Sequence, residues 1–167
     1  MRIFARKYKW YKDLFFQCNV LFDKSIQNSM FDSSRNALSY FVPNRFCAKY
    51  VAIKEQEGKE EKICIAAFMK DRREDACWIA GFVPSKIQNK GFGIYGAVAS
   101  LNELFKEHPR LTVFSASNAR NTRAVRVTSS IGFHIYIQDE RHCESSLTKE
   151  QFDNEFVGYI KDRYNIK

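Results

Sequence analysis

The chain has 167 residues, with 27 lysines and arginines against 19 aspartates and glutamates, which gives a formal net charge of +8. Hydrophobic residues make up 45% of the sequence and glycine and proline are few, which excludes a disordered or low-complexity protein. No apolar run reaches the roughly 18 residues of a membrane span, and the amino terminus, MRIFARKYKWYKD, lacks the apolar core of a signal peptide. We expect a single cytoplasmic domain over residues 1–167 that is not associated with a membrane.

The positive charge favours an anionic partner, which can be a nucleic acid, a nucleotide cofactor or an acidic substrate. The basic residues are spread along the chain without a basic tail or a known nucleic-acid motif, so no nucleic-acid partner is expected. The cysteines are scattered and contain no C-x-x-C pair; they are Cys18, Cys47, Cys64, Cys77 and Cys143. We expect them to be buried, reduced thiols, and we expect no metal site.

The first 45 residues are expected to be mostly helical. The segment YKDLFFQCNVLFDKSI has apolar residues at helical spacing, namely Leu14, Phe15, Cys18, Leu21 and Phe22. A second helix is expected in SSRNALSYFV, with Ser33 or Ser34 as its N-cap and Pro43 just after its end.

Three strands follow, in CAKYVAIKE, ICIAAFM and ACWIAGFV, separated by the polar turns EGKEEK and KDRRED. The loop PSKIQNK then leads into a helix with one apolar stripe, formed by Ile94, Ala97, Val98, Leu101, Leu104 and Phe105. Next come a strand in RLTVFSA, a turn, a helix closed by Gly132, and a strand in FHIYIQ.

A closing helix is expected in residues 146–167, where Thr148 and Gln151 form a capping box. Its predicted apolar face consists of Phe152, Phe156, Tyr159 and Ile160. The whole order of elements predicts a single α/β domain with a mixed central sheet flanked by helices. This sheet is expected to be antiparallel in its early strands and parallel at its centre.

The stretch QNKGFGIYGAV, residues 88–98, contains two overlapping glycine patterns. The pattern G-x-G-x-x-G is typical of a dinucleotide-binding turn, and Q-x-x-G-x-G is typical of a loop that binds the pyrophosphate of an acyl-CoA. Both use glycines so that backbone N–H groups can approach phosphate at the amino end of a helix. A third interpretation is a tight strand-to-helix turn without a ligand.

The surroundings of the loop disfavour a dinucleotide. In that fold the strand runs directly into the first glycine, and an acidic residue follows about 20 residues later. Here seven residues separate Val83 from Gly91, and the later stretch, TVFSASNAR, contains no acid. A nucleoside-triphosphate loop is also disfavoured, because G-K-[ST] does not follow the glycines.

A second motif, NTRAVRVTSSIGF at residues 121–133, lies one strand further on. The two motifs together resemble those of the GCN5-related N-acetyltransferase superfamily. In that family Q/R-x-x-G-x-G/A opens the central helix, and N-x-x-A-x-x-x-x-x-x-x-G-F follows the next strand. The matching residues are Gln88, Gly91 and Gly93 in the first motif and Asn121, Ala124, Gly132 and Phe133 in the second. The resemblance covers residues 63–137, while residues 1–45 contain nothing diagnostic.

The resemblance implies an N-acetyltransferase domain over residues 1–167, with a cofactor-binding core at 63–137, a helical acceptor-side region at 1–45 and a C-terminal helix at 146–167. Acetyl-CoA would be its co-substrate. The residues expected to bind it are Phe82, Val83, Gln88, Asn89, Lys90, Gly91, Phe92, Gly93, Ile94 and Asn121.

These residues divide into two groups by their expected contacts. The N–H groups from Asn89 to Ile94 would bind the phosphates at the positive end of the helix dipole, with Lys90 as a nearby cation. By family analogy, the pantetheine arm pairs with the strand that ends at Phe82 and Val83. Asn121 can contact that arm and can also cap its own helix.

The catalytic residues are not identified by the resemblance. Where many relatives carry a tyrosine that protonates the departing thiolate, this chain has Thr128, which we expect to face the core. The strand ACWIAGFV lacks the carboxylate that many relatives have there. Alternatives for a general base are Glu55, Glu57, His134 and His142. Candidates for lining an acceptor pocket are Tyr40, Phe41 and Trp78.

The expected reaction is direct transfer of an acetyl group from acetyl-CoA to an amine, by a monomer or homodimer. A small-molecule amine, such as an amino sugar, is slightly favoured as the acceptor because the chain has no visible peptide-docking extension. A protein or peptide amino terminus is the alternative. A CoA-binding module that has lost catalysis is a further alternative, because of Thr128 and the missing carboxylate.

Overall fold

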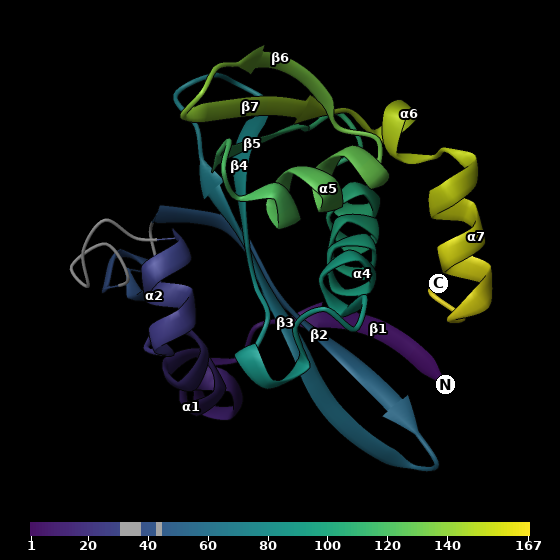
Figure 1. Ribbon diagram of the computed structural model, residues 1–167. Helices are drawn as coiled ribbons and strands as arrows, with labels where there is room; N and C mark the ends of the chain where they lie inside the picture. The colour runs from purple at the N-terminus through teal and green to yellow at the C-terminus, as the bar shows by residue number, and fades with distance from the viewer. Residues whose placement is uncertain (31–37, 43–44) are drawn as a thin grey trace.

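The computed structural model describes residues 1–30, 38–42 and 45–167. Its centre is one sheet of seven strands in the order β1-β2-β3-β4-β5-β7-β6 (Figure 1). The strands are β1 (Arg2–Lys7), β2 (Phe46–Gln56), β3 (Lys59–Lys70), β4 (Ala76–Phe82), β5 (Thr112–Asn118), β6 (His134–Gln138) and β7 (His142–Leu147). Neighbouring strands are antiparallel except β4 and β5, which are parallel. The predicted mixed sheet is confirmed, with its parallel part limited to this pair.

Helices cover both faces of the sheet (Figure 1). They are α1 (Trp10–Leu21), α2 (Lys24–Met30), α4 (Phe92–Glu107), α5 (Thr122–Ser130), α6 (Lys149–Phe152) and α7 (Glu155–Arg163), with short 3-10 helices η1 (Ser39–Phe41) and η3 (Ser85–Ile87). Residues of α1 and α2 pack on Ala80 and Phe82 at one face, and α4 and α7 pack into the larger core at the other. No helix in the described part of the chain is long and apolar enough to cross a membrane.

Two strands were not expected from the sequence. The first, β1, replaces the start of the expected helical region, because Ile3 fits the core while the edge of β2 supplies backbone partners. The second, β7, was hidden by its polar composition, HCESSL. Its alternate residues Cys143, Ser145 and Leu147 are buried, so the inward face of this strand includes a polar serine, which breaks the apolar alternation expected of a strand.

The turn between β2 and β3 is shorter than the predicted EGKEEK segment. Only Glu57 and Gly58 lie between the two strands, and their φ angles are +53° and +73°. Positive φ at both central residues is the requirement of a two-residue hairpin turn whose twist matches the strands. The polar stretch after Gly58 therefore continues as strand β3.

Only Leu21 of the apolar face predicted for α1 is fully buried in this helix. Its buried residues are Asp13, Gln17, Val20 and Leu21. Leu14 and Phe15 are 42% and 79% exposed. The helix is turned this way because the carboxylate of Asp13 has cationic partners in the interior, which a hydrophobicity pattern cannot register. The predicted second helix is only partly seen, since Ser33, Ser34 and Pro43 lie outside the described residues.

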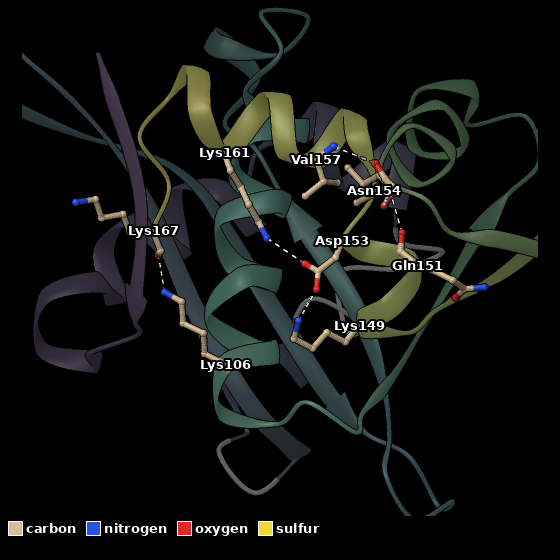
Figure 2. A network of polar contacts seen from close by, with 9 residues as sticks. Lys106, Lys149, Gln151, Asp153, Asn154, Val157, Lys161 and Lys167 are labelled. Atoms are coloured by element: carbon tan, nitrogen blue, oxygen red, sulfur yellow. Dashed lines mark hydrogen bonds and ion pairs between the residues drawn. The ribbon is translucent and has the colours of Figure 1, made fainter.

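The end of the chain forms two helices instead of the single one predicted. The capping box of Thr148 and Gln151 is confirmed at the start of α6. Asn154 then caps α7 by accepting a hydrogen bond from the Val157 N–H at 3.0 Å (Figure 2). This restart shifts the helical phase, so the buried residues are Phe152, Val157 and Ile160. Two residues of the predicted face, Phe156 and Tyr159, are instead 40% and 54% exposed.

Polar contacts join the two closing helices to each other and the chain end to α4 (Figure 2). The Asp153 carboxylate accepts hydrogen bonds from Lys149 and, at 3.3 Å, from Lys161. At the chain end, Lys106 of α4 donates to the Lys167 carbonyl at 2.5 Å. The C-terminus is thereby held beside α4.

Candidate functional site

The loop before α4 presents a row of free backbone donors. In the described part of the chain, the N–H groups of residues 89–93 have no hydrogen-bond acceptor. The next two, of Ile94 and Tyr95, bond to the Gly91 carbonyl at 3.0 and 3.2 Å and begin the helix. Five consecutive free donors at the positive end of a 16-residue helix are an arrangement suited to an anion.

Backbone conformation explains two residues of this loop. Asn89 and Gly91 have φ angles of +62° and +82°, in the left-handed region that asparagine and glycine tolerate best. A Cβ at Gly91 would also lie 2.8 Å from the ring of Tyr95. Gly91 is therefore required by both the turn and its neighbour.

The other two glycines of the motif have different surroundings. At Gly93 a Cβ would meet only ordinary contacts of 3.8 Å, so the protein itself does not require glycine there. At Gly96 a Cβ would lie 2.5 Å from the Cβ of Cys64 on β3. Gly96 thus permits close packing of α4 on the sheet and does not belong to the loop.

Gln88 fastens the loop to its surroundings through both ends of its amide. Its Nε2 donates to the Val83 carbonyl at 3.1 Å, and its Oε1 accepts from Arg123 of α5 at 3.2 Å. Arg123 therefore stands beside the free donors, although the motif comparison did not single it out. The sequence did contain a signal for the position of Arg123, because it lies two residues after the N-cap Asn121 and therefore in the first turn of α5.

The edge of β4 next to this loop is only partly paired. Ala76–Trp78 pair with Thr112–Phe114 of β5, and beyond Trp78 the two described strands separate. The remaining stretch of β4, to Phe82, keeps its pairing with β3 on the other side. The Phe82 side chain is buried and meets the ring of Tyr40 at 4.9 Å between centroids, edge to face. The part of β4 without a β5 partner therefore ends shortly before the loop of free donors, to which the Val83 carbonyl is tied by Gln88.

The two residues of interest on α5 make local bonds. Asn121 caps the helix by accepting from the Ala124 N–H at 3.2 Å, which was one of its two expected roles. The Thr128 hydroxyl donates to the carbonyls of Ala124 and Val125 at 3.1 and 3.0 Å. Thr128 is thus bonded back to its own helix. The expectation that it faces the core is not met in full, because Thr128 is only partly buried and α5 has no buried residue.

The candidate bases are dispersed. Glu55 pairs with Arg2 at 3.7 Å at the edge of the sheet, and Glu57 occupies the β2–β3 turn. His134 is exposed at the start of β6. His142 is the most organised of the four, because its Nε2 lies 2.7 Å from Glu144. None of them lies on β4.

A polar cluster surrounds Glu144 on the face of β6 and β7. Tyr136 donates to its carboxylate at 2.8 Å, opposite the contact from His142. Hydrogen bonds from His142 and Tyr136 lower the pKa of Glu144. Burial and the bond to Glu144 raise the pKa of Tyr136 to about 12. In the described residues no group of three metal-binding side chains comes together.

The cysteines follow the expectation in part. Cys64, Cys77 and Cys143 are buried, whereas Cys18 is partly buried and Cys47 is exposed. Burial raises the pKa of the Cys64 thiol to about 12, so this group is inert at neutral pH. Cys47 differs because a hydrogen bond with Cys77 lowers the pKa of its thiol.

Neither a family model nor a curated protein matches this sequence. Solved structures do match the fold. An acetyltransferase of the GNAT family from Bacillus anthracis is 18% identical with a TM-score of 0.68, over 90% of this chain and 96% of its own. The chain has the fold of the GCN5-related N-acetyltransferases. The fold suspected from the two motifs is therefore confirmed.

Two further GNAT structures have similar coverage. The aminoglycoside acetyltransferase AAC(6')-Ib, solved with paromomycin and acetyl-CoA, is 17% identical with a TM-score of 0.68, over 93% of this chain and 98% of its own. The ribosomal-protein-S5-alanine acetyltransferase from Vibrio fischeri is 14% identical with a TM-score of 0.63, over 92% and 97%. The same fold thus accepts very different amines in these neighbours.

Proposed function

We propose that this protein is an N-acetyltransferase that transfers an acetyl group from acetyl-CoA directly to an amine. The observation that carries the proposal is the row of five free N–H groups at residues 89–93, next to the unpaired part of the β4 edge. A pyrophosphate needs several donors in one concavity, and an amide-bearing arm needs an open strand edge. The bond from Gln88 to the Val83 carbonyl links the loop to the end of this strand, which supports the proposal.

The residues present fit acetyl-CoA, which supplies the activated acetyl thioester when bound. The free N–H groups and the helix dipole would hold the pyrophosphate, while Lys90 and Arg123 add positive charge at the loop. Gln88 keeps the loop tied to the strand end through the Val83 carbonyl. The unpaired edge of β4 would orient the pantetheine arm.

Catalysis would then rest mainly on positioning. A neutral amine attacks a thioester without a covalent enzyme intermediate, and correct placement of the two reactants supplies a large part of the acceleration. The Thr128 hydroxyl is engaged with its own helix, so this chain provides no acid at the position of the family tyrosine. The thiolate would take its proton from water or from the acceptor.

A small-molecule amine remains the favoured acceptor. The structural neighbours include enzymes named for aminoglycosides and spermidine, which are small amines, and one named for an alanine of a ribosomal protein. The alternative of a protein or peptide amino terminus is therefore retained. An inactive CoA-binding module is also retained, because Thr128 is engaged and β4 carries no carboxylate.

Calorimetry with acetyl-CoA and with NAD tests the binding half of the proposal. Acetyl-CoA should bind and NAD should not; binding of NAD alone would end the acyltransferase interpretation. Turnover of a broad amine panel, with the product identified by mass spectrometry, then tests catalysis. Acetyl-CoA binding without any acetylated product would favour the inactive module.

A further inference from the structure

Lys49 of β2 is a half-buried cation without a counter-charge. Its ammonium donates to the Tyr40 carbonyl at 2.8 Å and to Gln17 Oε1 at 3.4 Å. The rings of Tyr8 and Phe46 lie 4.6 and 4.5 Å from it. No carboxylate in the described part of the chain pairs with it, and burial lowers its pKa to about 8. Buried charges are normally paired, so this one calls for a reason.

The internal contacts of Lys49 do not need a charge. Gln17 is buried and already donates its Nε2 to the same Tyr40 carbonyl at 2.9 Å. A neutral side chain at position 49 would therefore leave that carbonyl satisfied. Because an ammonium has three donors and one of these two contacts is long, Lys49 retains donor capacity for a ligand.

The position of Lys49 connects it to the proposed reaction site. Lys49 pairs with Ala67 of β3, and Ala67 pairs with Ala80 of β4, so these three side chains share the sheet face that α1 and α2 cover. In this row only the methyl side chain of Ala67 separates Lys49 from Ala80, which lies on the part of β4 that does not pair with β5. The Tyr40 carbonyl accepts a hydrogen bond from Lys49, and the Tyr40 ring packs against Phe82 of β4.

The buried carboxylate of α1 is already engaged by other cations. The Asp13 carboxylate accepts from Arg6 at 2.7 and 2.8 Å and pairs with Lys62 at 2.8 Å. One carboxylate thus faces two cations, and Lys49 adds a third positive charge. A polycationic acceptor would meet net repulsion here, whereas an anionic group would find an unpaired ammonium.

We propose that Lys49 binds an anionic group of the acceptor, so that the acceptor is an amine that also carries a carboxylate or a phosphate. This rests on the proposed function, since it concerns the second substrate of that reaction. Lys49 acts as a specificity-determining residue and takes no part in bond breaking.

The first test compares acceptors that differ by one anionic group. One pair is an amino acid, which carries a carboxylate, and its amide. The other is glucosamine 6-phosphate, which carries a phosphate, and glucosamine. Spermidine is added as a polycationic acceptor. The anionic member should be favoured in kcat/KM by about 10- to 100-fold, the usual worth of a hydrogen bond to a charged group. A preference within the amino-acid pair would indicate a carboxylate-bearing acceptor, and a preference within the glucosamine pair would indicate a phosphate-bearing one.

Three variants assign this preference to Lys49. Lys49→Met should abolish it through KM, with acetyl-CoA affinity unchanged, and Lys49→Arg should restore most of it. Lys12→Met is the matched control, because it removes the same charge from the exposed outer side of α1 and should leave the preference intact. Equal use of the paired acceptors by the wild type, or a preference that survives Lys49→Met, would overturn the proposal.

A second test needs no turnover. The pKa of Lys49 is followed by NMR of isotope-labelled lysines with CoA bound, with and without acetate or inorganic phosphate. A bound anion should raise this pKa from about 8 by roughly one unit. The titratable residues in contact with the Lys49 ammonium are Tyr8, through its ring, and Tyr40, through its carbonyl.

The outcomes of this titration are decisive. An unmoved pKa at saturating acetate and phosphate would refute the anion site even when acetyl-CoA binds normally. Failure of acetyl-CoA to bind in calorimetry would instead refute the proposed function, which keeps the two results distinct.

Discussion

Single residues in the phosphate loop have separable tasks. Gly91 has a left-handed φ, and a Cβ there would lie too close to the ring of Tyr95, while Gly93 has room for a side chain. Gly96 belongs to the contact between α4 and Cys64. The three glycines look equivalent in the sequence but differ in the structure. Gly91 is needed for its backbone conformation and Gly96 for core packing, while Gly93 is one of the loop residues and is not required by the fold.

Substitution of the first two glycines should have opposite effects. Gly91→Ala should destabilise the protein by about 1–2 kcal/mol, because a left-handed alanine is strained, and should weaken acetyl-CoA binding about tenfold or more. Gly93→Ala is the matched control. It should stabilise the helix slightly, by about 0.5 kcal/mol, and leave affinity unchanged. Urea unfolding and calorimetry measure both quantities, and equal losses of affinity would contradict the assignment.

Thr128 provides the second prediction at this scale. Its hydroxyl already donates to helix carbonyls, so Thr128→Ala should change kcat by less than about threefold at saturating acetyl-CoA. A general acid typically contributes about 10²–10⁴-fold, so a proton donor here would be obvious in the rate. A loss of that size in a folded variant with normal CoA affinity would place Thr128 in a proton relay.

At the scale of elements, α1 is fixed to the sheet by a buried charge. Burial alone would raise the pKa of Asp13, but hydrogen bonds from Arg6 and Lys62 outweigh it and lower the pKa to about 2. The backbone N–H of Lys9 adds a further bond at 2.8 Å. This network orients the helix so that Leu14 and Phe15 face outward.

Asp13→Asn should therefore reduce the free energy of unfolding by roughly 3–5 kcal/mol, because two cations lose their buried partner. The control is Asp153→Asn, which breaks the more exposed pairs with Lys149 and Lys161 and should change this free energy by less than about 1 kcal/mol. Chemical denaturation at neutral pH measures both. Similar values for the two variants would show that the buried network contributes nothing special.

The same network sets an acid limit on stability. The folded pKa of Asp13 lies below its ordinary value of 3.8, so its contribution is present above about pH 4 and disappears as the pH falls towards 2. The loss of stability between pH 4 and 2 should be smaller in Asp13→Asn than in the wild type.

At the scale of the whole molecule, the proposed acetyl-CoA site joins β4, α4 and α5. A ligand that binds only the folded state stabilises the entire domain, by about 2.7 kcal/mol at one hundred times its Kd. For a chain of this length that corresponds to a rise in Tm of about 5–10 °C. Differential scanning calorimetry with acetyl-CoA should show this rise, and NAD at the same concentration should show none. A similar shift with NAD would contradict the assignment of the loop.

The sequence by itself determined the order of the central elements, the loop at residues 88–93 and the capping box at Thr148, because these signals are local. Glycine conformation, helical spacing and caps act over a few residues and can be recognised without a partner. The fold class followed, since the two motifs lie at a fixed separation in one family of folds.

Only the tertiary structure decided which polar groups are compensated. The outward turn of α1 depends on cations from β1 and β3 that meet Asp13. Likewise, Arg123 reaches Gln88 from 35 positions away, and Lys49 remains unpaired because no described carboxylate lies near it. The energy of a charge depends on all of its neighbours in space, which a one-dimensional pattern does not contain.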